Sequence, residues 1–430
     1  MKKILFAVLP LASILLASCG GKDSADNNIH GEVKGKITVL TNRTDIVDTK
    51  LAEYKKAFEE KYPGTTVEFE AITDYEGTVR TRMSTQEYGD VLCRPDIQSV
   101  DYPNFFEPLG TTEEFSEIMS DFAQKGTNPI SYDGTVYVYP LVAVVPTGLV
   151  CNKKVFESAG AEIPRSTKDF YAALGLIKKN TKAIPIYMNY PAGWTLNQWE
   201  GGLLSECGDI EYQNKVIHNP TPFYPKDGHY ELYKVMYDVV KMGFCERDLI
   251  ASDWERSKQM LADGGIGCMV LGSWAIAQVR ALSKNPDEIG YIPFPAEVDG
   301  KKYAEVNLDM PLCINKYSKN KATAYAWVRF IGDETDWVEY TQSIPVKKGE
   351  KMPSVLDDFE KMGVEYLSFA AARPGEEGIY NTLDKDSEIG FLSDPEKKRI
   401  IDAAVGTRSE TFEDIMADWN NRWAKANAVN

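Results

Sequence analysis

The chain has 430 residues and a formal net charge of −16, with 43% hydrophobic and 26% charged residues. This composition is typical of a soluble globular protein of two or three domains and excludes a mainly disordered chain. The acidic balance argues against a nucleic-acid binder or a protein held on an anionic membrane surface, and the presence of only three histidines argues against a histidine-based metal site.

The N-terminus has the pattern of an export signal. Two lysines precede an apolar run over residues 4–16, which is shorter than the roughly 20 residues that cross a bilayer. The Leu-Ala-Ser-Cys sequence that ends at Cys19 looks like the lipobox of bacterial lipoproteins, in which the signal is cut before the cysteine and the thiol is acylated. We predict a lipoprotein signal peptide at 1–18, lipidation of Cys19 and a flexible tether at 19–35. An ordinary secretory signal with an incidental cysteine is the alternative.

After the tether, predicted strands alternate with predicted helices. A β-branched strand at 36–41 precedes a helix at 48–61, in which apolar residues recur at helical spacing. A strand at 67–72, a polar helix at 75–86 and a strand at 89–93 continue the alternation. This order favours a parallel sheet with right-handed crossovers, in which ligands bind at the carboxyl ends of the strands.

The rest of the chain predicts a second set of strands and helices. Ser166 has the position of an N-cap for one helix, and Ser273 for a helix that runs to Leu282. Strands are predicted at 137–150, 184–188 and 267–271. Other helices are predicted at 166–180, 230–243, 253–263, 319–331, 355–362 and 411–426.

Six further cysteines are scattered along the mature chain, with no CxxC motif and no close pair. An even number in an exported protein permits three disulfides. Several lie in apolar runs, such as those around Cys268 and Cys313, so we favour buried free thiols. A catalytic cysteine is not favoured because no histidine is placed as its partner.

Short sequences along the mature chain form a characteristic series. They are 37–40 followed by 42–45, the run 58–63 before a strand, the runs 89–91 and 148–153, the glycine-rich run 265–274, and 314–318. In this order and spacing the chain resembles the family 1 extracellular solute-binding proteins, the carbohydrate receptors of ABC importers, over essentially its whole mature length. One departure is Cys151, where the family often carries an aromatic residue before the asparagine.

The resemblance implies an α/β, two-lobe periplasmic-binding-protein-like fold of type II, with parallel-rich sheets joined by crossing hinge strands. It implies chain crossings near 149–152, 307–313 and 343–346, and a sugar bound in the cleft between the lobes. The first lobe then comprises residues 36–149 and 308–343, and the second comprises residues 150–307 and 344–430.

On the second lobe, aromatic and amide side chains near strand ends are the candidates for sugar contact. A pyranose presents a C–H face on which aromatic rings stack, and a rim of hydroxyls that needs hydrogen bonds. Trp194 and Trp199 follow a strand end, Asn189 precedes them, and Trp274 stands at a strand-to-helix turn where the family places an aromatic against the sugar. Each tryptophan could instead fill a core. The other tryptophans fall within helical patterns that predict packing, namely Trp254, Trp327, Trp337, Trp419 and Trp423.

On the first lobe, the candidates are side chains that follow the predicted strands or lie beside a crossing. They are Asn42, Arg43, Asp45, Arg94, Tyr75 and Asp309. The alternatives are that Asn42 and Asp45 cap a helix beginning near Ile46, that the arginines form surface ion pairs, and that Tyr75 packs on its own helix.

These features predict a receptor that binds a sugar between two lobes and does not react with it. The predicted partners are a carbohydrate, the membrane permease of an ABC importer and a lipid bilayer reached through Cys19, on the outer face of the cytoplasmic membrane. We expect no cofactor, metal or nucleic acid. Two alternatives remain. One is a receptor for a peptide or polyamine, although Arg43 and Arg94 would oppose a cation. The other is a glycoside hydrolase, although no pair of acids stands out.

Overall fold

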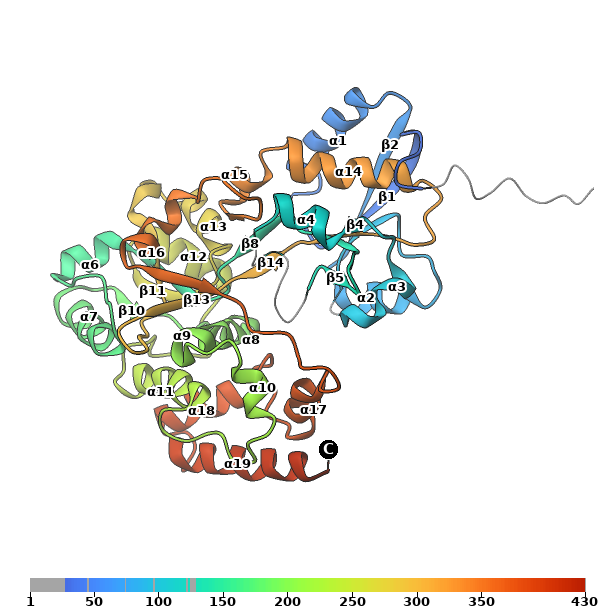
Figure 1. Ribbon diagram of the computed structural model, residues 1–430. Coiled ribbons are helices and arrows are strands. Elements are labelled where there is room, and N and C mark those ends of the chain that lie inside the picture. The colour runs from blue at the N-terminus through green and yellow to red at the C-terminus, as the bar shows by residue number, and fades with distance from the viewer. Residues whose placement is uncertain are drawn as a thin grey trace, which may run out of the picture.

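The computed structural model describes residues 28–44, 46–73, 75–95, 97–120, 123 and 129–429. The predicted signal peptide, Cys19 and Asp45 lie outside the described residues. Within the described part of the chain, no helix is both long enough and apolar enough to cross a bilayer. Figure 1 shows two α/β bodies joined by strands, with the C-terminal helices packed against the second body.

The first body is built on a five-stranded sheet in the order β2-β1-β3-β15-β7. β1 pairs in parallel with β2 and β3, as the alternation of strands and helices predicts. β15 pairs antiparallel with β3 and β7, so the sheet is mixed rather than parallel-rich. Its strands are β1 (Gly35–Thr41), β2 (Thr65–Ala71), β3 (Val91–Cys93), β7 (Val138–Tyr139) and β15 (Leu312–Ile314). The main helices beside it are α1 (Lys50–Lys61), α2 (Tyr75–Met83) and α14 (Lys321–Glu334).

Shorter elements complete the first body. A small antiparallel sheet has the order β4-β6-β5. Thr111 and Glu114 form a capping box at the start of α4, which satisfies two backbone N–H groups there. These elements are η1 (Ser99–Asp101), α3 (Tyr102–Phe105), β4 (Gly110–Thr111), α4 (Thr112–Ile118), β5 (Ser131–Tyr132), β6 (Thr135–Val136) and α15 (Trp337–Thr341).

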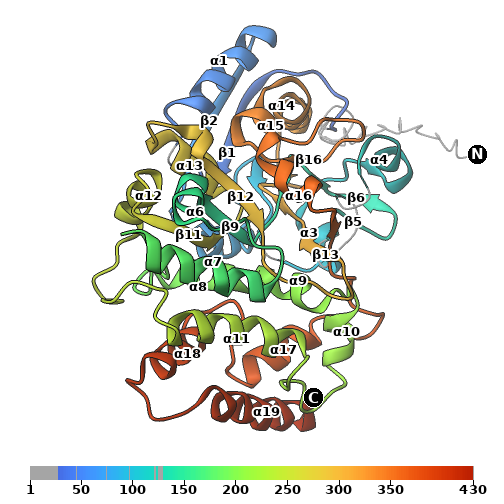
Figure 2. The same cartoon turned by 90° about the vertical axis from the view of Figure 1, so that its left-hand side faces the viewer.

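The second body is built on a four-stranded sheet in the order β10-β11-β9-β12. Only β10 and β11 are parallel; β9 runs antiparallel to both of its neighbours. Ser166 caps α7 by accepting the N–H of Asp169, as predicted. The strands are β9 (Gly148–Asn152), β10 (Ile184–Ile186), β11 (Ile266–Leu271) and β12 (Ile289–Pro293). The helices around them are α6 (Lys153–Ala159), α7 (Thr167–Asn180), α12 (Trp254–Ala262), α13 (Ala275–Leu282) and η3 (Pro286–Glu288), several of which are seen face-on in Figure 2.

Between the two sheets lies a three-stranded antiparallel sheet in the order β14-β8-β16 (Figure 1). Its strands are β8 (Val142–Val144), β14 (Asn307–Asp309) and β16 (Ile344–Pro345). The second and third expected crossings fall on β14 and β16. Residues 149–152, where the first crossing is expected, form most of β9 within the second sheet, and β8 lies just before them in the chain.

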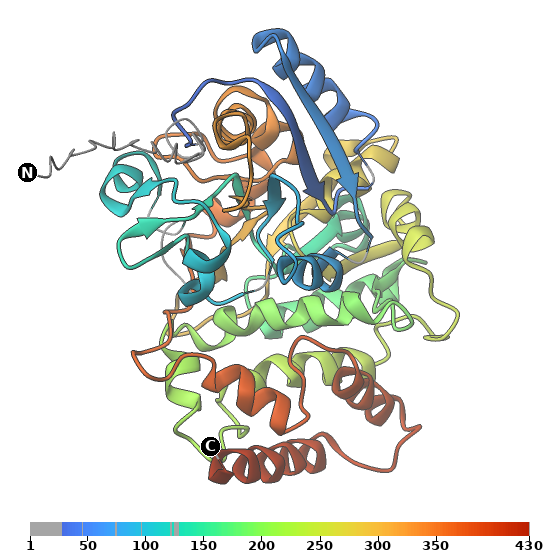
Figure 3. The same cartoon turned by 90° about the vertical axis from the view of Figure 1, so that its right-hand side faces the viewer.

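Helices gather at the end of the molecule opposite α1, as Figures 2 and 3 show. Phe223 packs edge-on against Trp419 and Trp423, and both indoles are buried, as predicted. The elements of this region are α8 (Gly193–Asn197), η2 (Gln198–Gly202), α9 (Leu203–Cys207), α10 (Tyr212–Val216), α11 (Gly228–Lys241), α17 (Ile379–Asp386), α18 (Pro395–Val405) and α19 (Phe412–Val429). The connecting elements are β13 (Lys302–Glu305), η4 (Ser354–Leu356), α16 (Asp357–Lys361) and β17 (Val364–Leu367).

The six cysteines of the body are free thiols, as predicted. Four are buried and two are half-buried. Burial raises the pKa of the Cys93 and Cys151 thiols to about 12, so neither is a thiolate at neutral pH.

Candidate functional site

Three tryptophans from separate segments meet on the second body. The Trp194 and Trp254 ring centroids are 4.9 Å apart in an edge-to-face arrangement, and Trp274 lies 5.8 Å from Trp194 and 6.2 Å from Trp254. Trp194 is 43% exposed, and the other two are half-buried. We call Trp194, Trp254 and Trp274 the indole cluster. It offers an apolar aromatic surface to solvent at the carboxyl end of β11.

The Trp274 ring is held from two sides. Its Nε1 donates a hydrogen bond to Oε1 of Gln198 at 3.2 Å. A Cβ placed on Gly272 would lie 2.4 Å from that same Nε1, so this turn needs glycine. Contacts within the protein therefore set the orientation of this indole.

Ser273 does not cap α13, contrary to the prediction. Its Oγ accepts the N–H of Val145 at 3.2 Å, and its own N–H donates to the Val145 carbonyl at 2.9 Å. The residue before α13 is Trp274, which makes no side-chain cap. Ser273 thus ties the end of β11 to the segment that leaves the three-stranded sheet, and places the indole cluster beside it.

The segment that carries Trp194 is held by α18. The Tyr190 hydroxyl donates to Oδ1 of Asp402 at 3.0 Å. Gly193 packs so closely on Asp394, at the start of α18, that an added Cβ would lie 1.9 Å from its Oδ2. Asn189, a predicted sugar contact, is only 1% exposed, and its side-chain amide donates to the Met269 sulfur at 3.4 Å.

Two other predicted contacts lie in hydrophobic cores. Trp199 is 2% exposed and packs edge-on against Phe294 in the second body. Tyr75 is 9% exposed, and its hydroxyl donates to the Cys93 carbonyl at 3.0 Å. Both rings are therefore buried in this structure.

Candidates on the first body gather at the carboxyl ends of β1 and β3, beside β14. Asn42 is exposed and Arg43 is half-buried. The Arg43 guanidinium lies 5.8 Å from the centroid of the Trp337 ring, and its Nη1 lies 3.9 Å from the Met310 sulfur. Burial raises the pKa of the nearby Asp309 carboxyl, and the positive charge of Arg43 opposes that rise.

Arg94 lies on the same side of the first sheet. The guanidinium Nη1 of Arg94 donates to the Tyr102 hydroxyl at 3.1 Å, and the backbone N–H of Arg94 donates to the Pro311 carbonyl at 2.8 Å. It is therefore tied to its own body. The alternative considered for Asn42, a cap at the start of the next helix, does not apply, because α1 begins at Lys50 and follows Thr49.

Two residues of the site were not predicted. Trp254 was assigned to packing, yet it is the first residue of α12, directly after the Asp253 cap, and its ring meets Trp194. Gln198 was not singled out. Helix position alone does not distinguish Trp254 from the buried tryptophans, because Trp337 is also the first residue of a helix and is 2% exposed.

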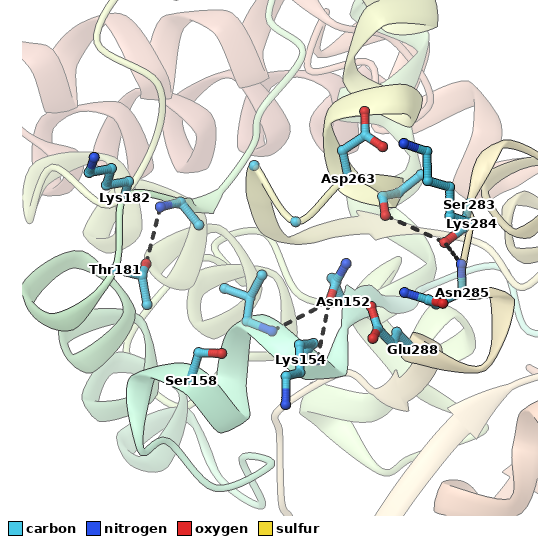
Figure 4. Close-up of a pocket in the computed structure, with 15 residues that line it drawn as sticks. Asn152, Lys154, Ser158, Thr181, Lys182, Asp263, Ser283, Lys284, Asn285 and Glu288 are labelled. Atoms are coloured by element: carbon cyan, nitrogen blue, oxygen red, sulfur yellow. Dashed lines mark hydrogen bonds between the residues drawn. The ribbon is translucent and has the colours of Figure 1, made fainter.

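A separate hollow of about 580 Å³ lies at the other end of β11. Figure 4 shows Thr181 and Lys182 on one side of it and Asp263, Ser283 and Lys284 on the other. The length of β11 places it roughly 20 Å from the indole cluster, at about 3.3 Å per residue. Within the described residues, no group of three or more histidine, cysteine or acidic side chains is arranged to hold a metal ion.

Comparison with known proteins agrees with this architecture. The multiple sugar-binding protein of Streptococcus mutans is 24% identical over 349 residues, which cover 77% of this chain and 78% of that protein. The diacetylchitobiose binding protein DasA of Streptomyces coelicolor is 28% identical over 314 residues, or 70% of this chain and 71% of that protein.

Solved structures with the same fold include two sugar complexes from Bifidobacterium animalis subsp. lactis. BlMnBP1, a binding protein of an ABC transporter in complex with mannobiose, is 33% identical with a TM-score of 0.81 and covers 93% of this chain and 96% of that one. The manno-oligosaccharide specific solute binding protein BlMnBP2, in complex with mannotriose, is 31% identical with a TM-score of 0.80 and the same coverage. Residues 42–335 match the family described as bacterial extracellular solute-binding protein, and the chain therefore belongs to that family.

Proposed function

We propose that this protein captures a short oligosaccharide between its two bodies and delivers it to an ABC importer. The observation that carries the proposal is the indole cluster, where Trp194 is 43% exposed beside two half-buried indoles. Because relatives that are 31–33% identical were solved with mannobiose and mannotriose, mannose oligosaccharides are the first ligands to test.

The residues present suit the chemistry of a sugar. An indole face covers the C–H face of a pyranose, and the edge-to-face geometry gives the cluster ring planes at different angles for successive sugar units. The hydroxyl rim needs donors and acceptors, which Gln198 supplies on the second body and Asn42 and Arg43 supply on the first. A sugar that touches both bodies makes its full set of contacts only when they close around it.

We propose that β8, β14 and β16 form the hinge. The first lobe is then residues 36–141 and 310–343, and the second lobe is residues 145–306 and 346–430. An antiparallel sheet of two- and three-residue strands supports this assignment, because a short sheet can twist with little loss of packing. Ligand binding would shift the population toward the closed form, which the permease would recognise.

The lipid anchor is part of the same proposal. Export through the signal at 1–18 and acylation of Cys19 would hold the body on the outer face of the cytoplasmic membrane, where the importer lies. Expression in a bacterium that acylates lipoproteins, followed by membrane fractionation, tests it. Cys19→Ala should move the protein from the membrane fraction to the soluble fraction, and an unchanged distribution would contradict the anchor.

A thermal-shift and calorimetry panel tests the receptor assignment. It would include mannobiose, mannotriose, diacetylchitobiose, a peptide mixture and a polyamine. A ligand at about 100 times its Kd stabilises the native state by about 2.7 kcal/mol, so a specific ligand is easily seen. Stabilisation by a sugar with no sugar turnover supports a receptor; response only to peptide or amine, or hydrolysis of the sugar, overturns the proposal.

A further inference from the structure

A buried carboxylate lies directly behind the segment that carries Trp194. Glu246 is 6% exposed. Its Oε2 accepts the N–H of Met188 at 3.0 Å, and its Oε1 accepts the N–H groups of Met188 at 3.2 Å and Asn189 at 3.1 Å. Two consecutive backbone N–H groups therefore end on one side chain that is far away in the sequence.

The turn held by this carboxylate has an unusual backbone. Asn189 has φ of 55°, a left-handed conformation that non-glycine residues rarely adopt unless their surroundings hold them there. The Asn189 carbonyl then accepts the N–H of Ala192 at 2.9 Å and the Thr195 hydroxyl at 3.4 Å. These bonds start α8, whose second residue is Trp194.

Glu246 also connects the two segments that each supply an indole. The N–H of Ile186 donates to the Phe244 carbonyl at 3.2 Å, so the chain before Asn189 runs beside the chain before Glu246. One segment continues to Trp194 and the other to Trp254. Trp194 and Trp254 are the closest pair of rings within the indole cluster, at 4.9 Å between centroids.

We propose that Glu246 is a positioning residue for the indole cluster, since its carboxylate fixes the left-handed turn at Asn189 and thereby sets Trp194 against Trp254. This proposal rests on the proposed sugar-binding function. Asn189 would act through its backbone rather than by touching the sugar, which agrees with its burial.

The electrostatics argue that this carboxylate is not kept for stability. Burial raises the pKa of Glu246 to about 7, and the N–H groups of Met188 and Asn189 only partly offset that rise. A raised carboxyl pKa means that its contribution to stability is present below about pH 4.5 and is lost as the pH rises through about 7. The other charged groups near this region are Asp253 and Arg256. Burial, together with Glu246 and Asp253, raises the pKa of the Tyr187 hydroxyl, and Arg256 opposes that rise. Above pH 7, the fold therefore bears the cost of a buried charge that a neutral side chain would avoid.

Glu246→Gln separates positioning from stability. The amide keeps one acceptor oxygen, but it places an NH₂ donor opposite the Met188 N–H, so the turn is held less well while the buried charge is removed. At about pH 8 we expect a melting temperature equal to or above that of the unmodified protein, with sugar affinity about tenfold weaker, as a misplaced contact group would cause. Glu246→Asp, which keeps the charge on a shorter arm, is the second variant if the amide variant folds poorly.

Two further variants sharpen the result. Glu206→Gln is the matched control, because this carboxyl in α9 is also buried with a raised pKa, while its buried Oε1 accepts no hydrogen bond from the described residues; it should leave the affinity unchanged. Asn189→Gly keeps the left-handed φ without the side chain, so it should retain the affinity within about twofold if Asn189 acts through its backbone.

The measurements are sugar calorimetry and the exciton signal of the coupled indoles in far-ultraviolet circular dichroism without ligand. The proposal predicts that Glu246→Gln changes both, and that Glu206→Gln changes neither. An affinity and a dichroism signal that are both unchanged in Glu246→Gln overturn it. If the unmodified protein binds no sugar, the proposed function fails, and the dichroism of the ligand-free variants still decides whether Glu246 sets the cluster.

Discussion

The indole Nε1 of Trp274 donates a hydrogen bond to Oε1 of Gln198 at 3.2 Å, which joins the turn after β11 to the first residue of η2. The hydroxyl of Thr147 in turn donates to the Gln198 carbonyl. Trp274 is thus oriented through a residue that is itself anchored beside β9. A ring that is already oriented loses less freedom when it stacks on a ligand, and this favours tight binding.

Trp274→Ala should weaken sugar binding at least about tenfold, which corresponds to about 1.4 kcal/mol, because the stacking face is lost. The melting temperature without ligand should change little, since the ring is half-buried at the surface. Calorimetry and thermal unfolding test both statements. Trp327→Ala is the control: that ring is 1% exposed in the first body, so its loss should cost about 3–5 kcal/mol of stability. An equal loss of stability in both variants would make Trp274 a core residue.

Trp254→Ala should weaken sugar binding less than Trp274→Ala, by about threefold to tenfold, because Trp254 supports the edge of Trp194. The ammonium Nζ of Lys258 lies 5.0 Å from the Trp254 ring centroid, and the substitution would remove this cation–π contact as well. In a double-mutant cycle, the losses of binding free energy in Trp254→Ala and Trp194→Ala should be non-additive, because removing either ring disrupts the same contact. Independent effects measured by calorimetry would show that the rings bind separately.

Gly193→Ala should force α18 away from the Trp194 segment, because its Cβ would lie 1.9 Å from Oδ2 of Asp394. Overpacking of this kind costs about 1–3 kcal/mol, and we expect weaker sugar binding together with a lower melting temperature. Adding Asp394→Gly to the Gly193→Ala variant removes the clash, and the double variant should recover part of the sugar affinity and part of the melting temperature. A Gly193→Ala variant that matches the unmodified protein in unfolding and calorimetry would contradict this close packing.

Glu206 should make the stability of the protein depend on pH. Burial and the nearby Glu231 raise the pKa of its carboxyl to about 8, so the folded state holds the proton over a range in which the unfolded chain has lost it. The stabilisation is complete below about pH 4.5 and is lost as the pH rises through about 8, at no more than about 1.4 kcal/mol per pH unit. Glu206→Gln should flatten the dependence of the unfolding free energy on pH over that range. Urea titrations at about pH 5 and about pH 8.5 measure the unfolding free energy of both proteins. An equal change in that free energy between the two pH values, with and without Glu206, would refute the prediction.

Sequence patterns identified the α/β class, the parallel β2-β1-β3 core and most helices, because these depend on local periodicity and capping. Ser166 is an example, since its hydroxyl meets an N–H only three residues away. The mixed orientation of both sheets was not predicted. β15 is an antiparallel neighbour of β3 although about 220 residues separate them along the chain, and no local signal reports such a pairing.

The candidate site divides in the same way. The sequence by itself determined that Trp194 and Trp274 follow strand ends, where a parallel-paired strand delivers side chains to one edge of a sheet. Only the tertiary structure decided that Trp199, Tyr75 and Asn189 are buried and that Trp254 completes the cluster, because burial depends on which segments pack together. A tryptophan has the same local pattern whether a neighbouring helix covers it or leaves its ring open to solvent.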